Sequence, residues 1–275
     1  MFLSTNSYGH GGDIWNYCRR KGCSFQDILD YSANINPMGP PESISGTLKN
    51  AIPEITAYPE PFARGLRQAV AQCYDILPEE VIIGNGAAEL IFLFCRALGK
   101  INAILPAPTF SEYALACQVN GGVLDYYYLN EKDNFAISAD NLLDYIKARG
   151  KSKHGRGKQN VLFLCQPNNP TGQVLPEGQL QHLFSALQEQ GVIPFLDLSF
   201  LGFIPGKLSD RGALPAVPIN NLRELLRKEC FDPGQNNSRA CSFFLLFSFT
   251  KLFALPGIRL GFGIGPRKLI AAMEK

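Results

Sequence analysis

A lysine and an arginine near the end of the chain, with two hydroxyl residues close to the lysine, carry the strongest chemical signal in the sequence. Lys251 closes the stretch Ser248-Phe-Thr-Lys, and Arg259 follows it eight residues later. A lysine amine that forms a Schiff base is the usual way in which a protein holds pyridoxal phosphate, which then supplies the difficult chemistry. A hydroxyl and a guanidinium suit a dianionic phosphate. We therefore predict pyridoxal 5'-phosphate as cofactor, Lys251 as the catalytic residue, and Ser248 and Arg259 as phosphate ligands.

Asp197 and Asn169 each follow an apolar run that predicts a buried strand. Asp197 comes directly after the run 192–196, and Asn169 lies in Gln166-Pro-Asn-Asn-Pro-Thr-Gly, after the run 161–165. A carboxylate beside a pyridine nitrogen keeps that nitrogen protonated, which the chemistry of pyridoxal phosphate requires. The doubled asparagine forms a proline turn in any case, and it is also well placed to donate hydrogen bonds into a crevice.

A glycine-rich turn completes this group of motifs. Gly84-Asn-Gly-Ala-Ala-Glu lies between a predicted strand and a predicted helix. Glycines at such a position let backbone N–H groups and a helix N-terminus approach a phosphate. Glycines are also common in ordinary strand-to-helix turns, so this turn alone is a weak signal. The combined pattern is specific because the motifs occur in one order. That order is the glycine-rich turn, Asn-Asn-Pro-Thr-Gly, the Asp at a strand end, and Ser-x-Thr-Lys with a following Arg.

The elements that must position these residues follow from the hydrophobic pattern. Short runs rich in Val, Ile, Leu and Phe alternate with helix-like stretches, which predicts an α/β protein with a parallel sheet covered on both faces. Such sheets place their binding sites at the ends of the strands. We expect strands in 81–83, 101–105, 161–165, 192–196, 243–247 and 260–262, and helices such as 87–98, 111–119 and 176–190.

The composition predicts a globular, cytoplasmic protein. Of the 275 residues, 46% are apolar and 18% are charged, so a substantial core can form. The net charge of +2 favours neither nucleic acid nor a membrane as partner, and no apolar run reaches membrane-spanning length. The N-terminus lacks the features of a signal peptide. The eight cysteines contain no Cys-x-x-Cys pair and the three histidines lie far apart, so we expect reduced, buried thiols and no metal site.

Four segments outside the strand-helix alternation have their own character. Residues 10–22 predict a helix, and 34–41 predict an extended, turn-rich arm. The segment 147–158 carries six Lys or Arg residues among Gly, Ser and His, which favours a solvated loop over a nucleic-acid site. Residues 266–275 resemble the opening of a helix, after which the chain stops.

In this order the motifs resemble those of the class I/II aminotransferases, which are fold-type I pyridoxal-phosphate enzymes. Three early motifs, His10-Gly-Gly, the arm 31–41 and Ala57-Tyr-Pro-Glu-Pro, are similar to the threonine-phosphate decarboxylases of cobalamin biosynthesis, a branch close to the histidinol-phosphate aminotransferases. The resemblance implies the aspartate aminotransferase-like fold, in which a three-layer α/β/α large domain with a mostly parallel sheet is joined to a small C-terminal domain. The implied division is an N-terminal arm and small-domain part in 1–50, a large cofactor-binding domain in 51–265, and the start of an interdomain helix in 266–275, with the small domain truncated.

The resemblance also assigns roles to single residues. Lys251 becomes the Schiff-base lysine, and Asp197 becomes the partner of the pyridine nitrogen. Asn169 is expected to hydrogen-bond the phenolic oxygen of the cofactor, and Phe110 to stack on its ring. The other implied roles are phosphate ligands at Gly86, Ala87, Ser248 and Arg259, a contribution of Tyr58 from the second subunit of a homodimer, and substrate contacts at His10, Gly11 and Asn34.

The function implied by the resemblance is a pyridoxal-phosphate-dependent lyase that acts on a phosphorylated amino acid. It would convert O-phospho-L-threonine to (R)-1-amino-2-propanol O-phosphate. Two alternatives stay open: an aminotransferase for histidinol phosphate or a related substrate, and a truncated, inactive protein of the same fold. Phe200 departs from the pattern, because many relatives carry a tyrosine there that bonds the phenolic oxygen. From the resemblance we also expect a small C-terminal domain, whose arginines would meet the substrate's carboxylate and phosphate, to be missing from this sequence.

Overall fold

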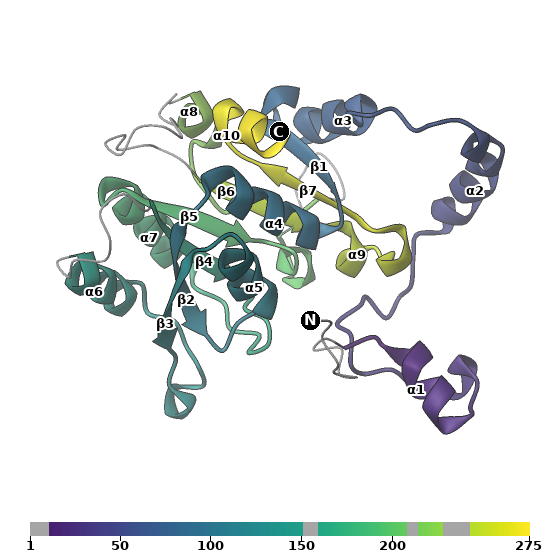
Figure 1. Cartoon of the computed structure of the whole chain (residues 1–275), viewed down its shortest axis with the longest axis horizontal. Helices are drawn as coiled ribbons and strands as arrows, with labels where there is room; N and C mark the ends of the chain where they lie inside the picture. The colour runs from purple at the N-terminus through teal and green to yellow at the C-terminus, as the bar shows by residue number, and fades with distance from the viewer. Residues whose placement is uncertain (1–10, 151–158, 208–213, 228–242) are drawn as a thin grey trace.

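A seven-stranded sheet forms the centre of the computed structural model, which describes residues 11–150, 159–207, 214–227 and 243–275 (Figure 1). The strands stand in the spatial order β1-β7-β6-β5-β4-β2-β3. Their bounds are β1 Val81–Asn85, β2 Ile101–Ala107, β3 Val123–Tyr128, β4 Gln159–Cys165, β5 Val192–Asp197, β6 Phe244–Ser248 and β7 Leu260–Ile264.

Strand direction decides which ends of these strands meet. Strands β2 to β6 pair in parallel, whereas β7 runs antiparallel to both of its neighbours, β1 and β6. β1 therefore points the same way as the parallel strands. As a result, the carboxyl ends of β1, β2, β4, β5 and β6 share one edge of the sheet with the amino end of β7.

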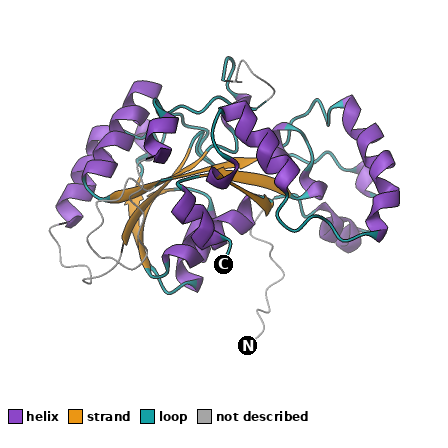
Figure 2. Ribbon diagram, turned by 90° about the horizontal axis from the view of Figure 1, so that it is seen from above, coloured by secondary structure: helices purple, strands orange, loops and turns teal. Residues whose placement is uncertain are grey.

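Helices cover both faces of the sheet, so the fold has three layers (Figure 2). The helices whose buried residues join the core of one face are α4 Ala87–Leu98, α5 Ser111–Val119 and α10 Arg267–Met273. Those on the other face are α3 Arg64–Tyr74, α6 Ala139–Gly150, α7 Glu177–Glu189 and α8 Leu222–Arg227. A four-residue helix, α9 Phe249–Leu252, follows β6 at the edge where the strand ends meet.

The two cores explain why the sequence shows continuous apolar runs. Successive side chains of a strand point to opposite faces, so a strand covered on both faces must be apolar throughout. In β4 the residues divide accordingly, with Leu162 and Leu164 in one core and Val161, Phe163 and Cys165 in the other. In contrast, α4 buries one stripe, as expected of a helix on a single face: Leu90, Ile91, Phe94 and Cys95.

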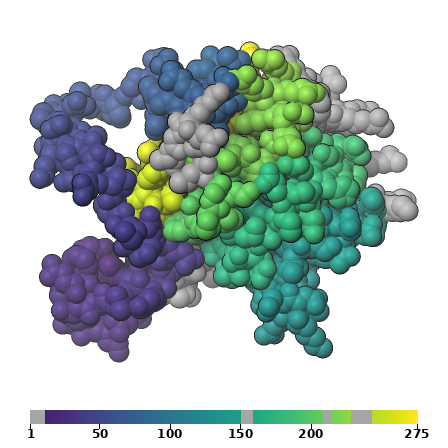
Figure 3. Space-filling view, turned by 180° about the vertical axis from the view of Figure 1, so that it is seen from behind, coloured from purple at the N-terminus to yellow at the C-terminus, as the bar shows by residue number. Residues whose placement is uncertain are grey.

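The first 60 residues contribute no strand in the described part and form a lobe beside the sheet. This lobe contains α1 Ile14–Lys21 and α2 Glu42–Ala51, and the turn-rich arm at 34–41 lies directly before α2. Figure 3 shows these residues in purple and dark blue, standing out from the body of the molecule. The remaining short helices are of the 3₁₀ type: η1 Phe25–Asp27, η2 Ile52–Thr56, η3 Pro78–Glu80, η4 Glu131–Asp133, η5 Leu201–Phe203 and η6 Pro256–Ile258.

Most elements predicted from the sequence are confirmed. The six expected strands and the helices at 87–98, 111–119 and 176–190 are present within two residues of their expected ends. The helix expected at 10–22 is shorter, because Asp13 caps its start and Gly22 ends it in a left-handed conformation. The prediction of a loop at 147–158 was wrong for residues 147–150, which belong to α6. Residues 151–158 lie outside the described residues. The six described cysteines are all free thiols.

Candidate active site

Seven of the residues predicted from the motifs line one pocket at the edge where the strand ends meet. The register explains this, because Cys165 pairs with Asp197, Asp197 with Leu246, and Ser248 with Gly261 on adjacent strands. The cavity has a volume of about 140 Å³. Its predicted members are Ala87, Phe110, Asn169, Asp197, Ser248, Lys251 and Arg259, and Ala88, Cys165, Ser199, Phe200 and Thr250 complete the lining.

Lys251 sits in the first turn after β6, on the short helix α9. Ser248 caps this helix through its Oγ, which accepts a hydrogen bond from the Thr250 N–H at 3.3 Å and lies 2.6 Å from the Thr250 hydroxyl. The Lys251 side chain is half-buried. Burial lowers the pKa of its amine, and the positive charge of Arg259 lowers the pKa further, whereas the negative charge of Asp197 opposes both effects. A lowered pKa increases the fraction of neutral, nucleophilic amine at a given pH.

Asp197 ends β5 as a carboxyl group that is only 4% exposed. Both of its oxygens accept hydrogen bonds: Oδ2 from the Tyr113 hydroxyl at 2.6 Å and Oδ1 from the Ser199 N–H at 2.9 Å. Burial raises the pKa of Asp197 above its usual value, and the bonds from Ser199 and Tyr113 act in the opposite direction because they favour the charged form. A cation bound in the pocket would therefore favour the charged form of this buried carboxyl group.

Tyr113 is a site residue that the motifs did not reveal. It lies in α5, fully buried, and its ring stacks on Phe163 with centroids 5.3 Å apart. It also meets Phe110 edge-on at 5.6 Å. Burial beside Asp197 raises the pKa of the Tyr113 hydroxyl, so it remains a hydrogen-bond donor. No pattern in the sequence links Tyr113 to Asp197, because the contact spans 84 residues and depends on how α5 packs on the sheet.

The opposite end of the pocket is cationic. Asn85 pairs with Leu260, so Gly86, which follows Asn85, lies against Arg259, which precedes Leu260. Gly86 has a φ of +84°, and a Cβ placed there would lie 2.6 Å from Nη2 of Arg259. Glycine is therefore needed for both the backbone angle and the close approach of the guanidinium. Arg259 makes no ion pair with the described residues, and α4 begins directly after Gly86, so its N-terminus adds to the positive potential.

Asn168 holds together the two loops that carry Phe110 and Asn169. Its side-chain amide donates to the Pro108 carbonyl at 3.0 Å and to the Thr171 hydroxyl at 2.8 Å. Its side-chain oxygen accepts from the Thr109 hydroxyl at 3.2 Å. Asn168 is 4% exposed and faces these loops, whereas the neighbouring Asn169 lines the pocket. The side-chain amide of Asn169 makes no hydrogen bond within the described part of the chain.

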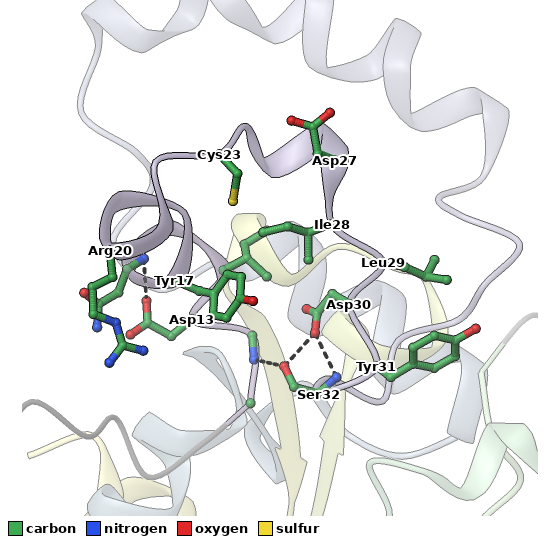
Figure 4. A pocket seen from close by; sticks show the side chains of 14 residues that line it. Asp13, Tyr17, Arg20, Cys23, Asp27, Ile28, Leu29, Asp30, Tyr31 and Ser32 are labelled. Atoms are coloured by element: carbon green, nitrogen blue, oxygen red, sulfur yellow. Dashed lines mark hydrogen bonds between the residues drawn. The ribbon is translucent and has the colours of Figure 1, made fainter.

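The remaining predicted residues do not line this pocket. Gly11 lines a separate and larger one of about 820 Å³, formed entirely by the N-terminal lobe and shown in Figure 4. There Ser32 accepts a hydrogen bond from the Gly12 N–H at 2.7 Å and donates its hydroxyl hydrogen to Asp30 at 2.6 Å. Asn34 and Tyr58 are exposed, and His10 lies outside the described residues.

Two further points concern metal binding and membranes. Within the described residues, no cluster of His, Cys, Asp or Glu has the arrangement of a metal site. In the same part of the chain, no helix has the length and apolar character needed to cross a bilayer.

The three layers, the sheet order and the pocket at the strand ends define an α/β protein of the pyridoxal-phosphate-dependent transferase type. The model of the family described as aminotransferase class I and II matches residues 26–275. The chain belongs to that family.

Two relatives are similar in sequence to most of this chain. One from Caldanaerobacter subterraneus, whose name proposes a threonine-phosphate decarboxylase, is 33% identical over 98% of this chain and 62% of its own length. The threonine-phosphate decarboxylase of Salmonella typhimurium is 32% identical over 92% of this chain and 60% of its own length. The chain thus spans 60–62% of the length of these two relatives.

A solved structure shows the same fold. The crystal structure of L-threonine-O-3-phosphate decarboxylase from Porphyromonas gingivalis superposes with a TM-score of 0.63 at 20% identity. The match covers 88% of this chain and 64% of that one. The expected fold class, an aspartate aminotransferase-like α/β fold with a mostly parallel sheet, is confirmed.

Proposed function

We propose that the chain binds pyridoxal phosphate through Lys251 and serves the decarboxylation of O-phospho-L-threonine in cobalamin biosynthesis. The observation that carries this proposal is the single pocket in which the Lys251 amine, the buried Asp197 carboxyl group and the Arg259 guanidinium meet. The names of the relatives at 33% and 32% identity support the choice of substrate. The products would be CO2 and (R)-1-amino-2-propanol O-phosphate.

The pocket fits this cofactor in its charge and in the chemistry of its side chains. When bound, pyridoxal phosphate supplies an aldehyde for an amine and a protonated ring that withdraws electrons from the substrate's α carbon. Lys251 supplies a half-buried amine whose pKa is lowered, and Asp197 supplies a buried carboxyl group for the ring nitrogen. The close approach of Arg259 to Gly86 leaves a cation beside a helix N-terminus, which suits a phosphate. The residues proposed to hold the phosphate are Gly86, Ala87, Ser248 and Arg259.

The middle of the pocket would hold the cofactor ring. Phe110 provides an aromatic face, and Asn169 provides an amide whose donors are not used by other described residues. Phe200 lines the same pocket, so the tyrosine hydroxyl found in many relatives is replaced by an apolar edge. The loss of that single hydrogen bond costs about 1 kcal/mol. Phe200 is thus compatible with cofactor binding.

Decarboxylation and transamination differ in which bond of the α carbon lies perpendicular to the cofactor ring, so orientation of the substrate selects the reaction. We propose that the early arm supplies this orientation through Gly11 and Asn34, joined by His10. The Lys251 Nζ or a water molecule would return a proton to the α carbon after CO2 has left. A histidinol-phosphate aminotransferase remains the alternative that the substrate test must separate.

We also propose that two copies of the chain associate, with Tyr58 reaching the pocket of the other copy. The Tyr58 side chain is fully exposed and lies outside the pocket of its own chain. Large apolar side chains near it in the sequence are also more than 40% exposed, which favours a covered surface. They are Leu48, Ile52, Ile55 and Phe62. Sedimentation equilibrium should give twice the mass of one chain, and a monomer at all concentrations would oppose this proposal.

Cofactor capture is the first test of the proposed function. The purified chain mixed with pyridoxal phosphate should turn yellow, and borohydride should fix the cofactor on the peptide that contains Lys251. Lys251→Ala should abolish this label, whereas the control Lys268→Arg, on the exposed face of α10, should leave it intact. A wild-type protein that takes up no cofactor under these conditions would rule out both enzyme hypotheses.

Substrate turnover is the second test. Incubation with O-phospho-L-threonine should release CO2 without any added 2-oxoglutarate. Consumption of histidinol phosphate and 2-oxoglutarate, with formation of glutamate, would instead identify the aminotransferase. Cofactor capture at Lys251 without either reaction would assign this chain as a cofactor-binding protein of the same fold that lacks activity by itself.

A further inference from the structure

Asn36 is the residue at which the N-terminal arm touches the turn that carries Lys251. Its backbone N–H donates to the Lys251 carbonyl oxygen at 3.1 Å. Its side-chain Nδ2 donates to the Leu252 carbonyl oxygen at 2.9 Å, across 216 residues of sequence. Two hydrogen bonds from a single residue therefore fasten the arm to α9.

The helix α9 has carbonyl groups that need such partners. It is only four residues long, and the last carbonyl groups of any helix have no partner within the helix. The Phe253 N–H donates to the Phe249 carbonyl at 3.2 Å, and the Ala254 N–H donates to the Lys251 carbonyl at 3.3 Å. The Leu252 carbonyl receives its hydrogen bond from the Asn36 amide. Asn36 thus acts as a C-terminal cap supplied by a distant segment.

The other polar groups of Asn36 fix the bend of the arm itself. Its Oδ1 accepts from the Met38 N–H at 3.0 Å, and its carbonyl oxygen accepts from the Gly39 N–H at 3.2 Å. The same side chain therefore holds the arm's turn with its oxygen and α9 with its nitrogen. Aspartate at this position would keep the acceptor for Met38 and lose the donor to Leu252.

We propose that Asn36 is a positioning residue that sets the distance between the substrate-facing arm and Lys251. This role rests on the proposed function, because Asn34, two residues earlier, is the proposed substrate contact. The helices α1 and α2 of the N-terminal lobe lie away from the sheet (Figure 1). The two hydrogen bonds from Asn36 to α9 therefore set the position of the arm relative to the pocket. An arm released from α9 would present Asn34 to the substrate in many positions.

Hydrogen exchange tests the fastening in the full chain without cofactor or substrate. In Asn36→Asp, the backbone amides of 35–39 and 253–255 should exchange about tenfold faster, as expected for losing a hydrogen bond of ordinary strength at a locally opening site. The matched control is Asn120→Asp, because Nδ2 of Asn120 also caps a helix end, donating to the Ala116 carbonyl at 2.8 Å. The control should change exchange only near the end of α5.

A second variant separates the lost bond from the added charge. Asn36→Ala removes both side-chain bonds without a carboxylate and should accelerate exchange in the same two segments. Exchange at wild-type rates in both variants, with folding verified by circular dichroism, would overturn the proposal. Because this test uses no cofactor, it decides the fastening even if the chain captures no pyridoxal phosphate and the proposed function fails.

Kinetics then test the positioning role. Asn36→Asp should lower kcat/KM for O-phospho-L-threonine about tenfold, while the Kd for pyridoxal phosphate changes by less than about threefold, because a misplaced arm binds and orients the substrate less well and leaves the cofactor cradle intact. Faster exchange combined with an unchanged kcat/KM would leave Asn36 a structural cap and contradict the positioning role. A large loss of cofactor affinity would contradict it as well, since the defect would then lie in the Lys251 turn.

Discussion

The hydrogen bond from Tyr113 to Asp197 gives a sharp test of how the pocket controls its buried carboxyl group. The Tyr113 hydroxyl donates to Oδ2 of Asp197 at 2.6 Å, and both groups are buried. Tyr113→Phe removes one oxygen atom and keeps the ring that stacks on Phe163. The variant thus removes the hydrogen bond with little change in packing.

The size of the effect depends on whether Asp197 is charged. A hydrogen bond to a charged acceptor contributes about 1.5–3 kcal/mol, and one between neutral groups about 0.5–1.5 kcal/mol. Burial raises the pKa of Asp197 above its ordinary 3.8. Between 3.8 and the raised pKa the folded chain holds a proton that the unfolded chain has released, so the free energy of unfolding falls as the pH rises through this window. Without the Tyr113 hydroxyl the pKa of Asp197 rises further, and the window extends to higher pH.

Urea unfolding of the cofactor-free chain at several pH values measures this directly. The difference between wild type and Tyr113→Phe should grow from about 1 kcal/mol in acid to about 1.5–3 kcal/mol once Asp197 is ionised in wild type. Tyr145→Phe is the matched control, because its hydroxyl donates to Asp125 at the same distance of 2.6 Å in a more exposed position. The control should lose less, because its hydroxyl lies in a more exposed position. Parallel curves for wild type and Tyr113→Phe would refute the assigned role of the bond.

Three further predictions concern the rest of the pocket. Gly86→Ala should weaken pyridoxal phosphate binding at least tenfold in a fluorescence titration, because its Cβ would lie 2.6 Å from the Arg259 guanidinium at a strained φ of +84°; an unchanged Kd would contradict the phosphate cradle. Asn168→Ala should lower the free energy of unfolding, measured in urea, by about 2–4 kcal/mol, since three side-chain hydrogen bonds are lost. A loss below about 1 kcal/mol would show that the two loops keep their positions without these bonds. Asp197→Asn should lower the pKa of Lys251, because it removes the negative charge that raises it; borohydride trapping with pyridoxal should then reach half its maximum at lower pH, and a shift to higher pH would contradict the assignment.

The sequence predicted the interior strands well because their burial on both faces leaves a continuous apolar run. It did not predict β3, whose residues Val123–Tyr128 are all exposed or half-buried. Among the described strands β3 pairs with β2 alone and stands at the sheet edge, so its position does not require an apolar run. The edge position thus explains why its three tyrosines and Asp125 gave no strand signal.

The site was predictable where a residue directly follows a strand and unpredictable where it reaches the pocket from elsewhere. Asp197, Lys251 and Asn169 each come at or just after a strand end, and parallel strands bring such residues to one edge. Tyr113 contacts Asp197 from α5 across 84 residues, and the Asn36 side chain contacts Leu252, the neighbour of Lys251, from the arm across 216 residues. Contacts of this kind depend on tertiary packing, which hydrophobic periodicity does not encode. The predicted roles of all the site residues, including Gly11, Asn34 and Tyr58, stay predictions.

The reversed direction of β7 is the feature of the sheet on which the charge pattern of the pocket depends. Arg259 directly precedes β7, and it meets Gly86 only because β7 enters the sheet from the edge at which β1 leaves it. Were β7 parallel to β1, its amino end would lie at the far side of a five-residue strand, about 17 Å away at about 3.4 Å per residue. Lys251 would then lose the neighbouring cation that lowers its pKa, and the N-terminus of α4 would face the pocket without a guanidinium. Among the described strands, the one antiparallel strand therefore places the Arg259 guanidinium in the same pocket as the Lys251 amine and the Asp197 carboxyl group.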